Sequence, residues 1–491
     1  MCFFYIFVQS KIFYMKVINL FIFFIVTVFF VGCKKEAIES DFDLSEKIQS
    51  KSQNLQAFSA GDGQWDLLGY GYNILGDYAH SNSATFPIID VERMKSEHPT
   101  YVIPSGAETA TSFYEAGQNA LEFSKKITGK IVANGGVDFL FKGNIDLHFN
   151  STDKWSSKYI YGSYSAIAIK RRVKIINDIA LMRNYLHQGF LNHLNTLSPA
   201  GLVSLYGTHV LIDIKLGGRM DVIYRAETYN SDRTKAATAG AKFSFLKIFG
   251  TETEGSYDVN EAKTNFNESA YVRTVGGSSA GALSTNLTYN SNLNPGFTFN
   301  ASAWASGLTD ENAELMDIAP NGIIPLYELI SDATKRQQLK VYIDNYLAQN
   351  KVVISYDRLP VYQYYNSSAT GYLFFTDVNR GSAYWSLEGE QFKAPSPGTP
   401  LASPIHEYWN EAELDWIWSS EDIPEINVSY VPNKIYKNEG LRFYGFKTQQ
   451  PGTIPIYLHC RSSNVHFLST TKQFATPMKS TKIAFYAYPK G

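Results

Sequence analysis

The sequence predicts an α+β protein whose second part is all β. In the first part, a helical stretch ends near Leu205 and runs into a long strand, because the residues from Thr208 to Lys215 alternate in a strand-like way. The last part, residues 359–491, contains three diverged copies of one unit rich in short strands. A chain of 491 residues is also too long for a single hydrophobic core, so two or three domains are expected.

Two pairs of glycines punctuate the strands of the first part. The strand that begins near Thr208 contains Gly217-Gly218 and continues through residues 220–225. A polar segment rich in small residues follows, and a second strand, residues 269–275, ends on Gly276-Gly277. Paired glycines in a strand mark a bend or a close approach of two backbones. The sequence therefore predicts two long strands separated by a polar segment. Each strand is expected to contain a bend or a close approach of two backbones at its glycine pair.

The order of these elements resembles a known family. The run Tyr206-Gly207-Thr208-His209, six or seven mostly apolar residues, and then Gly217-Gly218 resembles the signature of the membrane-attack-complex/perforin (MACPF) family of pore-forming proteins. The resemblance extends over roughly residues 61–350, from a Gly-Tyr strand at 69–75 to Trp304 and a closing helical run at 324–347. It implies a bent, twisted central antiparallel sheet flanked by two helical clusters, which opens at hinges formed by Gly217-Gly218 and Gly276-Gly277.

A second interpretation of the motif requires no family. The strand could simply be kinked, with His209 as a hydrogen-bonded structural histidine, because nothing in the sequence pairs this side chain with a nucleophile or a set of metal ligands.

The resemblance further implies that two segments, roughly 107–158 and 231–267, refold into β-hairpins that line a pore. In the first, residues 137–149 alternate: the odd positions are apolar except Gly143, and the even positions are polar except Leu140. Thirteen residues at about 3.3 Å each, tilted by about 40°, span roughly 33 Å, close to the ~30 Å hydrocarbon core of a bilayer. If the segment formed a helix, the same apolar residues would be distributed around the helix axis and would not form one stripe.

The second segment repeats the pattern more weakly, because Lys247 interrupts its apolar face of alternating alanines and phenylalanines. The residues expected to enter the membrane are Phe139, Phe141, Ile145, Leu147, Phe149, Phe243 and Phe245. The alternative for residues 137–149 is a half-buried strand of a soluble sheet, which shows the same alternation.

The first 33 residues predict a lipoprotein signal peptide. Lys16 precedes an apolar run that ends at Phe30-Val31-Gly32-Cys33, which resembles a bacterial lipobox with Cys33 as the acylated residue. A membrane-spanning anchor is the alternative, but residues 17–32 fall short of the ~20 that a spanning helix needs. Residues 34–60 are polar and predict a tether to a MACPF domain at 61–350.

The three C-terminal copies predict a pseudo-threefold, β-trefoil-like domain within residues 351–491. They open at Pro360, Pro404 and Pro455 and close on strands centred on Phe392, Phe443 and Phe485. Most of their aromatic residues are expected to form a shared core. Tryptophans that break the repeat are candidates for receptor binding, namely Trp385, Trp409, Trp416 and Trp418. Trp416 and Trp418 share a strand face, so an outward pair would offer a flat stacking platform to a sugar ring.

The composition argues against other classes of function. A net charge of −2 provides no basic field for nucleic acid. The sequence contains no nucleophile elbow, Walker loop, zinc-protease motif or paired-cysteine site, so neither an enzyme nor a cofactor is expected.

The function predicted from the resemblance is that of an exported lipoprotein from a Bacteroidota-type bacterium, located at the outer membrane or cell surface. Its partners would be a surface receptor, either protein or glycan, other copies of itself in a ring, and the target membrane into which it inserts hairpins as an antibacterial factor. The alternative is an adhesin or a nutrient-binding lipoprotein that keeps the fold without perforating. Release of dye from target cells or liposomes distinguishes the two.

Overall fold

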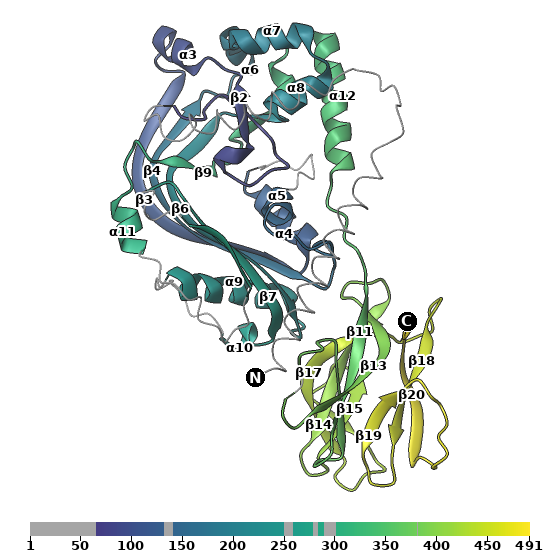
Figure 1. The fold of residues 1–491 in the computed structure, drawn as a ribbon. Helices are drawn as coiled ribbons and strands as arrows, with labels where there is room; N and C mark the ends of the chain where they lie inside the picture. The colour runs from purple at the N-terminus through teal and green to yellow at the C-terminus, as the bar shows by residue number, and fades with distance from the viewer. Residues whose placement is uncertain (1–64, 132–140, 250–258, 278–282, 289–300, 381) are drawn as a thin grey trace, which may run out of the picture. The chain divides into compact units, whose positions relative to one another are not determined.

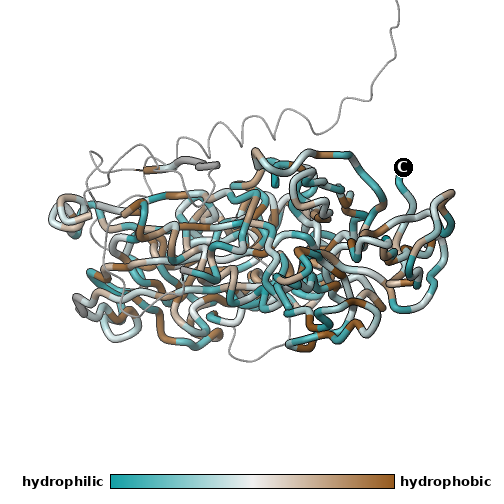
Figure 2. Tube along the Cα trace, turned by 90° about the horizontal axis from the view of Figure 1, so that it is seen from below, coloured by the Kyte–Doolittle hydropathy of each residue, from teal (hydrophilic) through white to brown (hydrophobic). Residues whose placement is uncertain are grey.

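The computed structural model describes residues 65–131, 141–249, 259–277, 283–288, 301–380 and 382–491. The predicted signal peptide and tether, residues 1–60, lie outside this part. Residues 53–491 form one compact unit, in which an α+β region is followed by an all-β region (Figure 1). No helix among the described residues is long and apolar enough to cross a membrane. Accordingly, Figure 2 shows apolar and polar residues interleaved along the described chain.

A six-stranded antiparallel sheet forms the centre of the α+β region. Its strands follow the order β3-β4-β6-β7-β8, and β9 also pairs with β6. They are β3 (Val102–Gly117), β4 (Ile160–Ile175), β6 (Asp213–Thr228), β7 (Asn265–Val275), β8 (Ser284–Thr288) and β9 (Glu314–Ile318). A four-stranded sheet lies beside it in the order β10-β5-β1-β2, formed by β1 (Tyr70–Tyr72), β2 (Ala84–Pro87), β5 (His209–Leu211) and β10 (Ile323–Pro325).

The two faces of the central sheet differ in chemistry. Because side chains alternate along a strand, Val222 and Tyr224 of β6 point to one face and Asp221 and Ile223 to the other. The first face is apolar and packs against α9 (Arg233–Phe249). The second carries buried polar groups and faces α5 (Gly143–Asp146). Figure 1 shows α9 on the outer side of the curved strands and α4 and α5 on the inner side.

Most of the other helices begin where the sequence supplies a capping side chain. Asn119 accepts a hydrogen bond from the amide of Glu122 at the start of α4 (Ala120–Gly129), and Ser198 precedes a proline at the start of α8 (Pro199–Tyr206). The remaining helices are α3 (Val91–Glu97), α6 (Ile179–Met182), α7 (Gln188–Thr196), α10 (Val259–Ala262), α11 (Ala301–Ser306) and α12 (Ala333–Gln349).

The all-β region consists of three equivalent units, which confirms the predicted pseudo-threefold architecture. In each unit the first strand pairs with both the second and the last strand. The rings of Phe392, Phe443 and Phe485 meet at the centre with centroid distances of 5.7, 5.8 and 5.6 Å. The strands are β11 (Arg358–Asn366), β12 (Gly371–Phe375), β13 (Ser386–Pro395), β14 (Ala402–Asn410), β15 (Asp415–Ser419), β16 (Glu425–Asn427), β17 (Ile435–Phe446), β18 (Ile454–Cys460), β19 (His466–Ser469) and β20 (Ser480–Pro489).

Candidate functional site

The Tyr206–His209 motif joins α8 to β5. Gly207 ends α8 with a φ of +70°, a conformation that favours glycine. The amide of Thr208 donates to the carbonyl of Tyr72 in β1 at 3.0 Å. His209 is buried, its Nδ1 lies 2.9 Å from the hydroxyl of Thr208, and burial lowers its pKa to about 3. The motif therefore acts as a structural junction, with His209 as a buried, neutral histidine.

Both glycine pairs lie beneath one tryptophan, Trp304. Its indole nitrogen donates to the carbonyl of Gly276 at 2.9 Å. A Cβ added at Gly218 or at Gly277 would lie 2.7 Å from the Trp304 ring, and one added at Gly276 would lie 2.2 Å from the carbonyl oxygen of Gly217. Gly276 and Gly277 also have positive φ angles of +68° and +81°. The resting fold thus requires glycine at these positions, and their role as hinges stays a prediction.

The first helical cluster comprises α4, α5 and the residues around them. The helical cluster expected here is present, and the alternative of a half-buried strand over residues 137–149 is wrong for the described part, which from Phe141 onward forms α5 and adjoining turns. Phe141, Ile145 and Phe149 are spaced by four residues, so a helical turn brings all three to one buried face. Leu147 points away and is 61% exposed. Phe139 lies outside the described residues.

A buried network of charged side chains holds this cluster on the polar face of the sheet. The carboxylate of Asp77 contacts Nε2 of His148 at 3.0 Å and accepts a hydrogen bond from Arg273 of β7 at 2.7 Å. Arg273 also donates to Asp221 of β6 at 2.9 Å. The His148 ring stacks on Tyr271 with a centroid distance of 3.6 Å.

Electrostatics explain why this network tolerates burial. Burial alone would raise the pKa of Asp77, but the charge of Arg273 and the hydrogen bond from His148 outweigh it and hold that pKa well below its ordinary value. No sequence pattern marks these residues, because His148 and Arg273 are 71 and 196 positions away from Asp77.

The second helical cluster is built on α9. Ala237, Ala241 and Phe245 are buried against the apolar face of the sheet as parts of this helix, and Ala239 is buried as well. The small alanine side chains let α9 approach the sheet closely. Phe243 is partly exposed, and the ammonium group of Lys247 lies 4.4 Å from the centre of its ring. One turn of helix thereby brings together the apolar residue and the lysine that interrupts the predicted strand face.

Three of the four candidate tryptophans lie together at the surface of the all-β region. We call Trp385, Trp409 and Trp416 the tryptophan patch; each is partly exposed, and Trp416 lies 4.0 Å from Trp409 and 5.4 Å from Trp385 between ring centroids. The prediction that Trp418 joins them is wrong. Trp418 is 1% exposed and donates to Glu407 at 3.2 Å, because Phe374 of the first unit packs edge-on against its ring in the core.

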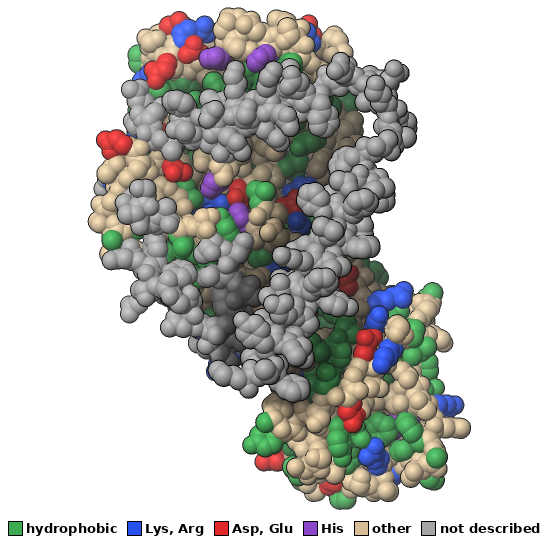
Figure 3. Space-filling model, in the orientation of Figure 1, with side chains coloured by type: hydrophobic (Ala, Val, Ile, Leu, Met, Phe, Trp, Pro, Cys, Tyr) green, Lys and Arg blue, Asp and Glu red, His purple; other side chains and the backbone are tan. Residues whose placement is uncertain are grey.

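More than half of the large apolar side chains that are exposed in the described chain belong to the all-β region. Figure 3 shows hydrophobic side chains gathered on the visible face of this region, with charged side chains scattered among them. These exposed residues are Val378, Tyr384, Leu387, Leu401, Leu414, Ile423, Ile435, Phe474 and Ile483. Several of them lie in loops.

A buried network of titratable groups in the all-β region is centred on Asp415. Nδ1 of His466 lies 2.5 Å from Asp415, which also accepts a hydrogen bond from the hydroxyl of Tyr436 at 2.7 Å. Burial raises the pKa of the neighbouring Cys460 to about 11, so this cysteine remains an unreactive thiol. Across the described residues, no group of three or more His, Cys, Asp or Glu side chains is placed to hold a metal ion.

Comparisons with known proteins agree with this geometry. The family model described as "MAC/Perforin domain" matches residues 59–354, and one described as "Domain of unknown function (DUF5648)" matches residues 360–487. The perivitellin-2 67 kDa subunits of Pomacea canaliculata and Pomacea maculata are 28% identical over 186 residues, which cover 36% of this chain and only 28% of those proteins.

A solved structure shows the same fold. GNIP1Aa from Chromobacterium piscinae superposes with a TM-score of 0.51 at 15% identity, over 84% of this chain and 92% of that chain. A protein with a MAC/Perforin domain from Bacteroides thetaiotaomicron gives a TM-score of 0.47 at 17% identity, over 63% of this chain and 66% of that one. With a match that covers more than half of its length, the chain belongs to the MAC/Perforin domain family.

Proposed function

We propose that this chain is a pore-forming lipoprotein that acts against other bacteria. It is exported and acylated at Cys33, recognises a target surface through its all-β region, and assembles with copies of itself into a ring. Both helical clusters then leave the central sheet and enter the target membrane as β-hairpins.

The position of the clusters in the sheet supports this conversion. The first cluster connects β3 to β4 and the second connects β6 to β7, and each pair consists of adjacent antiparallel strands. A cluster that unfolds can therefore extend both of its strands without changing their pairing. Residues 118–159 and 229–264 would supply hairpin arms of about 21 and 18 residues, or roughly 53 and 45 Å after a tilt of about 40°, enough to cross ~30 Å of hydrocarbon.

The exposure of Leu147 is the observation that carries the proposal. The resting structure buries Phe141, Ile145 and Phe149 around α5 and leaves Leu147 61% exposed. In an extended strand all four fall on one face, since they occupy odd positions. The apolar residues of this segment therefore fit both the four-residue spacing of a helix and the two-residue alternation of a strand. Leu147 has an apolar environment only in the extended form.

The all-β region offers the surface for recognition. The tryptophan patch presents three partly exposed rings in contact, an arrangement suited to stacking against a sugar. Recognition of a glycan or a glycan-bearing receptor through these rings is part of the proposal.

Release of dye from liposomes and from cells of related bacteria tests the proposed function. The purified, acylated protein is expected to bind target cells, sediment as a ring-sized assembly and release the dye. Binding without release or assembly would favour the adhesin instead.

A further inference from the structure

The two helical clusters join the central sheet at one place. β3 ends at Gly117, β4 begins at Ile160, β6 ends at Thr228 and β7 begins at Asn265. The pairing of Gly117 with Tyr161, Ile160 with Ala226, and Thr228 with Asn265 brings these four ends side by side. Both clusters must pivot about this end of the sheet if they are to extend as hairpins. We call these four ends the cluster junctions.

Arg233, the first residue of α9, ties the cluster junctions together. Its guanidinium donates to the carbonyl oxygens of Gln118 at 3.0 Å, Ser157 at 2.8 Å and Lys158 at 3.0 Å. The side chain is buried, and no carboxylate lies within ion-pair distance of it among the described residues. A single buried cation thus connects the second cluster to both ends of the first.

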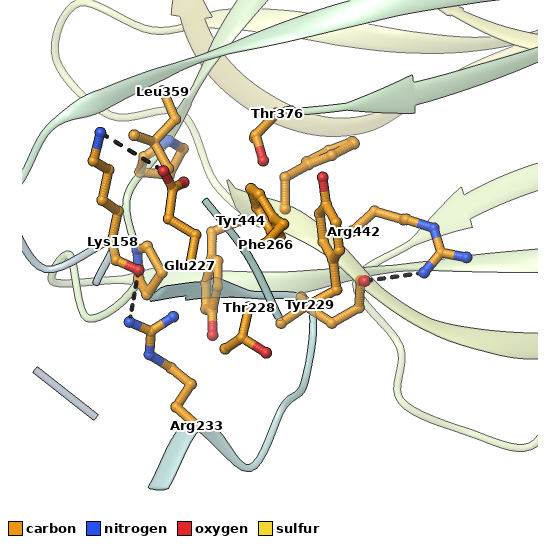
Figure 4. A pocket seen from close by; sticks show the side chains of 14 residues that line it. Lys158, Glu227, Thr228, Tyr229, Arg233, Phe266, Leu359, Thr376, Arg442 and Tyr444 are labelled. Atoms are coloured by element: carbon orange, nitrogen blue, oxygen red, sulfur yellow. Dashed lines mark hydrogen bonds and ion pairs between the residues drawn. The ribbon is translucent and has the colours of Figure 1, made fainter. Parts of the chain in front are cut away.

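The all-β region covers the cluster junctions directly. The hydroxyl of Ser157 lies 2.8 Å from that of Ser396, and the amide of Ser157 donates to the carbonyl of Ser355 at 2.9 Å. Figure 4 shows the hydroxyl of Tyr444, from β17, pointing toward the guanidinium of Arg233 across a small cavity that residues of both regions line.

Aromatic contacts extend this cover to the second cluster. The ring of Tyr229, just after β6, lies 6.1 Å from that of Phe375 and stacks on Phe266 of β7 at 4.4 Å. The guanidinium of Arg380 lies 5.2 Å from both the Tyr229 and the Phe375 rings. Two of these contacts, Tyr229 with Phe375 and Tyr229 with Arg380, join the all-β region to the end of β6.

We propose that the all-β region is an internal restraint on pore opening, which holds both helical clusters at their junctions until it is displaced. Engagement of a surface by the all-β region would then be coupled to the release of α9, since the same region makes both contacts. This inference rests on the proposed function for its biological meaning. The restraint itself is a property of the resting molecule and can be measured without a membrane.

A reversible cross-link tests the restraint. In the junction variant, Ser157→Cys with Ser396→Cys, oxidation should join the two regions where the native hydroxyls lie 2.8 Å apart. The matched control is Ser396→Cys with Thr399→Cys, because those hydroxyls lie 3.5 Å apart within one region. Hydrogen exchange of the α9 amides in the full chain should slow by at least tenfold in the oxidised junction variant, recover on reduction, and stay unchanged in the control.

A loosening variant provides the opposite test. Arg380→Ala removes two ring contacts from an exposed side chain and should speed α9 exchange about threefold. Lys472→Ala, an exposed cation on a loop of the third unit, should leave it unchanged. Failure of the junction variant to form its disulfide, or equal α9 exchange in its oxidised and reduced forms, would overturn the restraint. Loss of dye release with the restraint intact would count against the proposed function alone.

Discussion

The indole nitrogen of Trp304 donates a hydrogen bond to the carbonyl of Gly276 at 2.9 Å. The same ring covers Gly218 on the neighbouring strand, so one side chain from α11 covers both glycine pairs of the central sheet. The glycines are therefore part of a packed contact in the resting molecule. Any opening of the sheet at this point must first separate Trp304 from it.

Gly276→Ala is expected to destabilise the resting fold by about 2 kcal/mol or more. Its φ of +68° is unfavourable for alanine, and the new Cβ would lie 2.2 Å from a backbone oxygen. Gly129→Ala is the matched control, because its Cβ would meet no atom within 4 Å at the end of α4. Urea unfolding should show this loss of unfolding free energy for Gly276→Ala and no loss for Gly129→Ala. Equal stability of parent and Gly276→Ala would mean that the close contact does not exist.

Asp77→Ala should cost about 3–5 kcal/mol of unfolding free energy. The substitution leaves Arg273 and His148 buried without the carboxylate that both contact. Lys340→Ala is a suitable comparison, since it breaks an exposed pair with Asp344 and should cost less than about 1 kcal/mol. Similar small losses for both variants, measured by denaturant unfolding, would show that the network contributes little.

His209 should make the fold less stable as the pH falls. Burial lowers its folded pKa from 6.5 to about 3, so between these values the unfolded chain binds a proton that the folded chain does not. Unfolding free energy should therefore fall below pH 6.5, by up to about 1.4 kcal/mol per pH unit from this group. His209→Gln should flatten the dependence between pH 6.5 and 5. A slope identical to that of the parent would contradict a neutral, buried His209.

The sequence predicted much of the fold, because the features that mark it are local. The Tyr206–His209 motif, the glycine pairs and the three C-terminal copies are short patterns, and strands β6 and β7 and the pseudo-threefold units follow from them. The helical conformation of residues 141–149 in the resting structure could not be predicted from such a local pattern. Its apolar residues fit both a period of two and a spacing of four, and only tertiary packing selects the helix.

Other features depended on contacts between distant residues. The network around Asp77 and the cover of the cluster junctions by Arg233 and Ser396 join segments far apart in the chain. The side on which Trp418 packs depends on Phe374 from another unit, so strand alternation alone could not place it.

Trp409→Ala should weaken binding to target cells by about tenfold while the fold remains intact. Its ring belongs to the partly exposed tryptophan patch, and stacking contacts of this kind contribute about 0.5–1.5 kcal/mol each. Trp418→Ala should instead destabilise the domain by about 3–5 kcal/mol, because it empties a buried site. Binding assays on cells, paired with thermal unfolding, separate the two effects. Unchanged binding by a folded Trp409→Ala would remove the patch from the receptor site.

Leu147→Lys, compared with Asn150→Lys, tests pore formation most directly. Both residues are exposed in the resting structure, so neither lysine should disturb folding or surface binding. In the extended hairpin Leu147 faces lipid, where a lysine costs roughly 2–4 kcal/mol near the bilayer midplane in every subunit, whereas Asn150 faces the lumen. Dye release from target liposomes should be abolished by Leu147→Lys and retained by Asn150→Lys. Equal release by the two folded variants would contradict insertion of this segment.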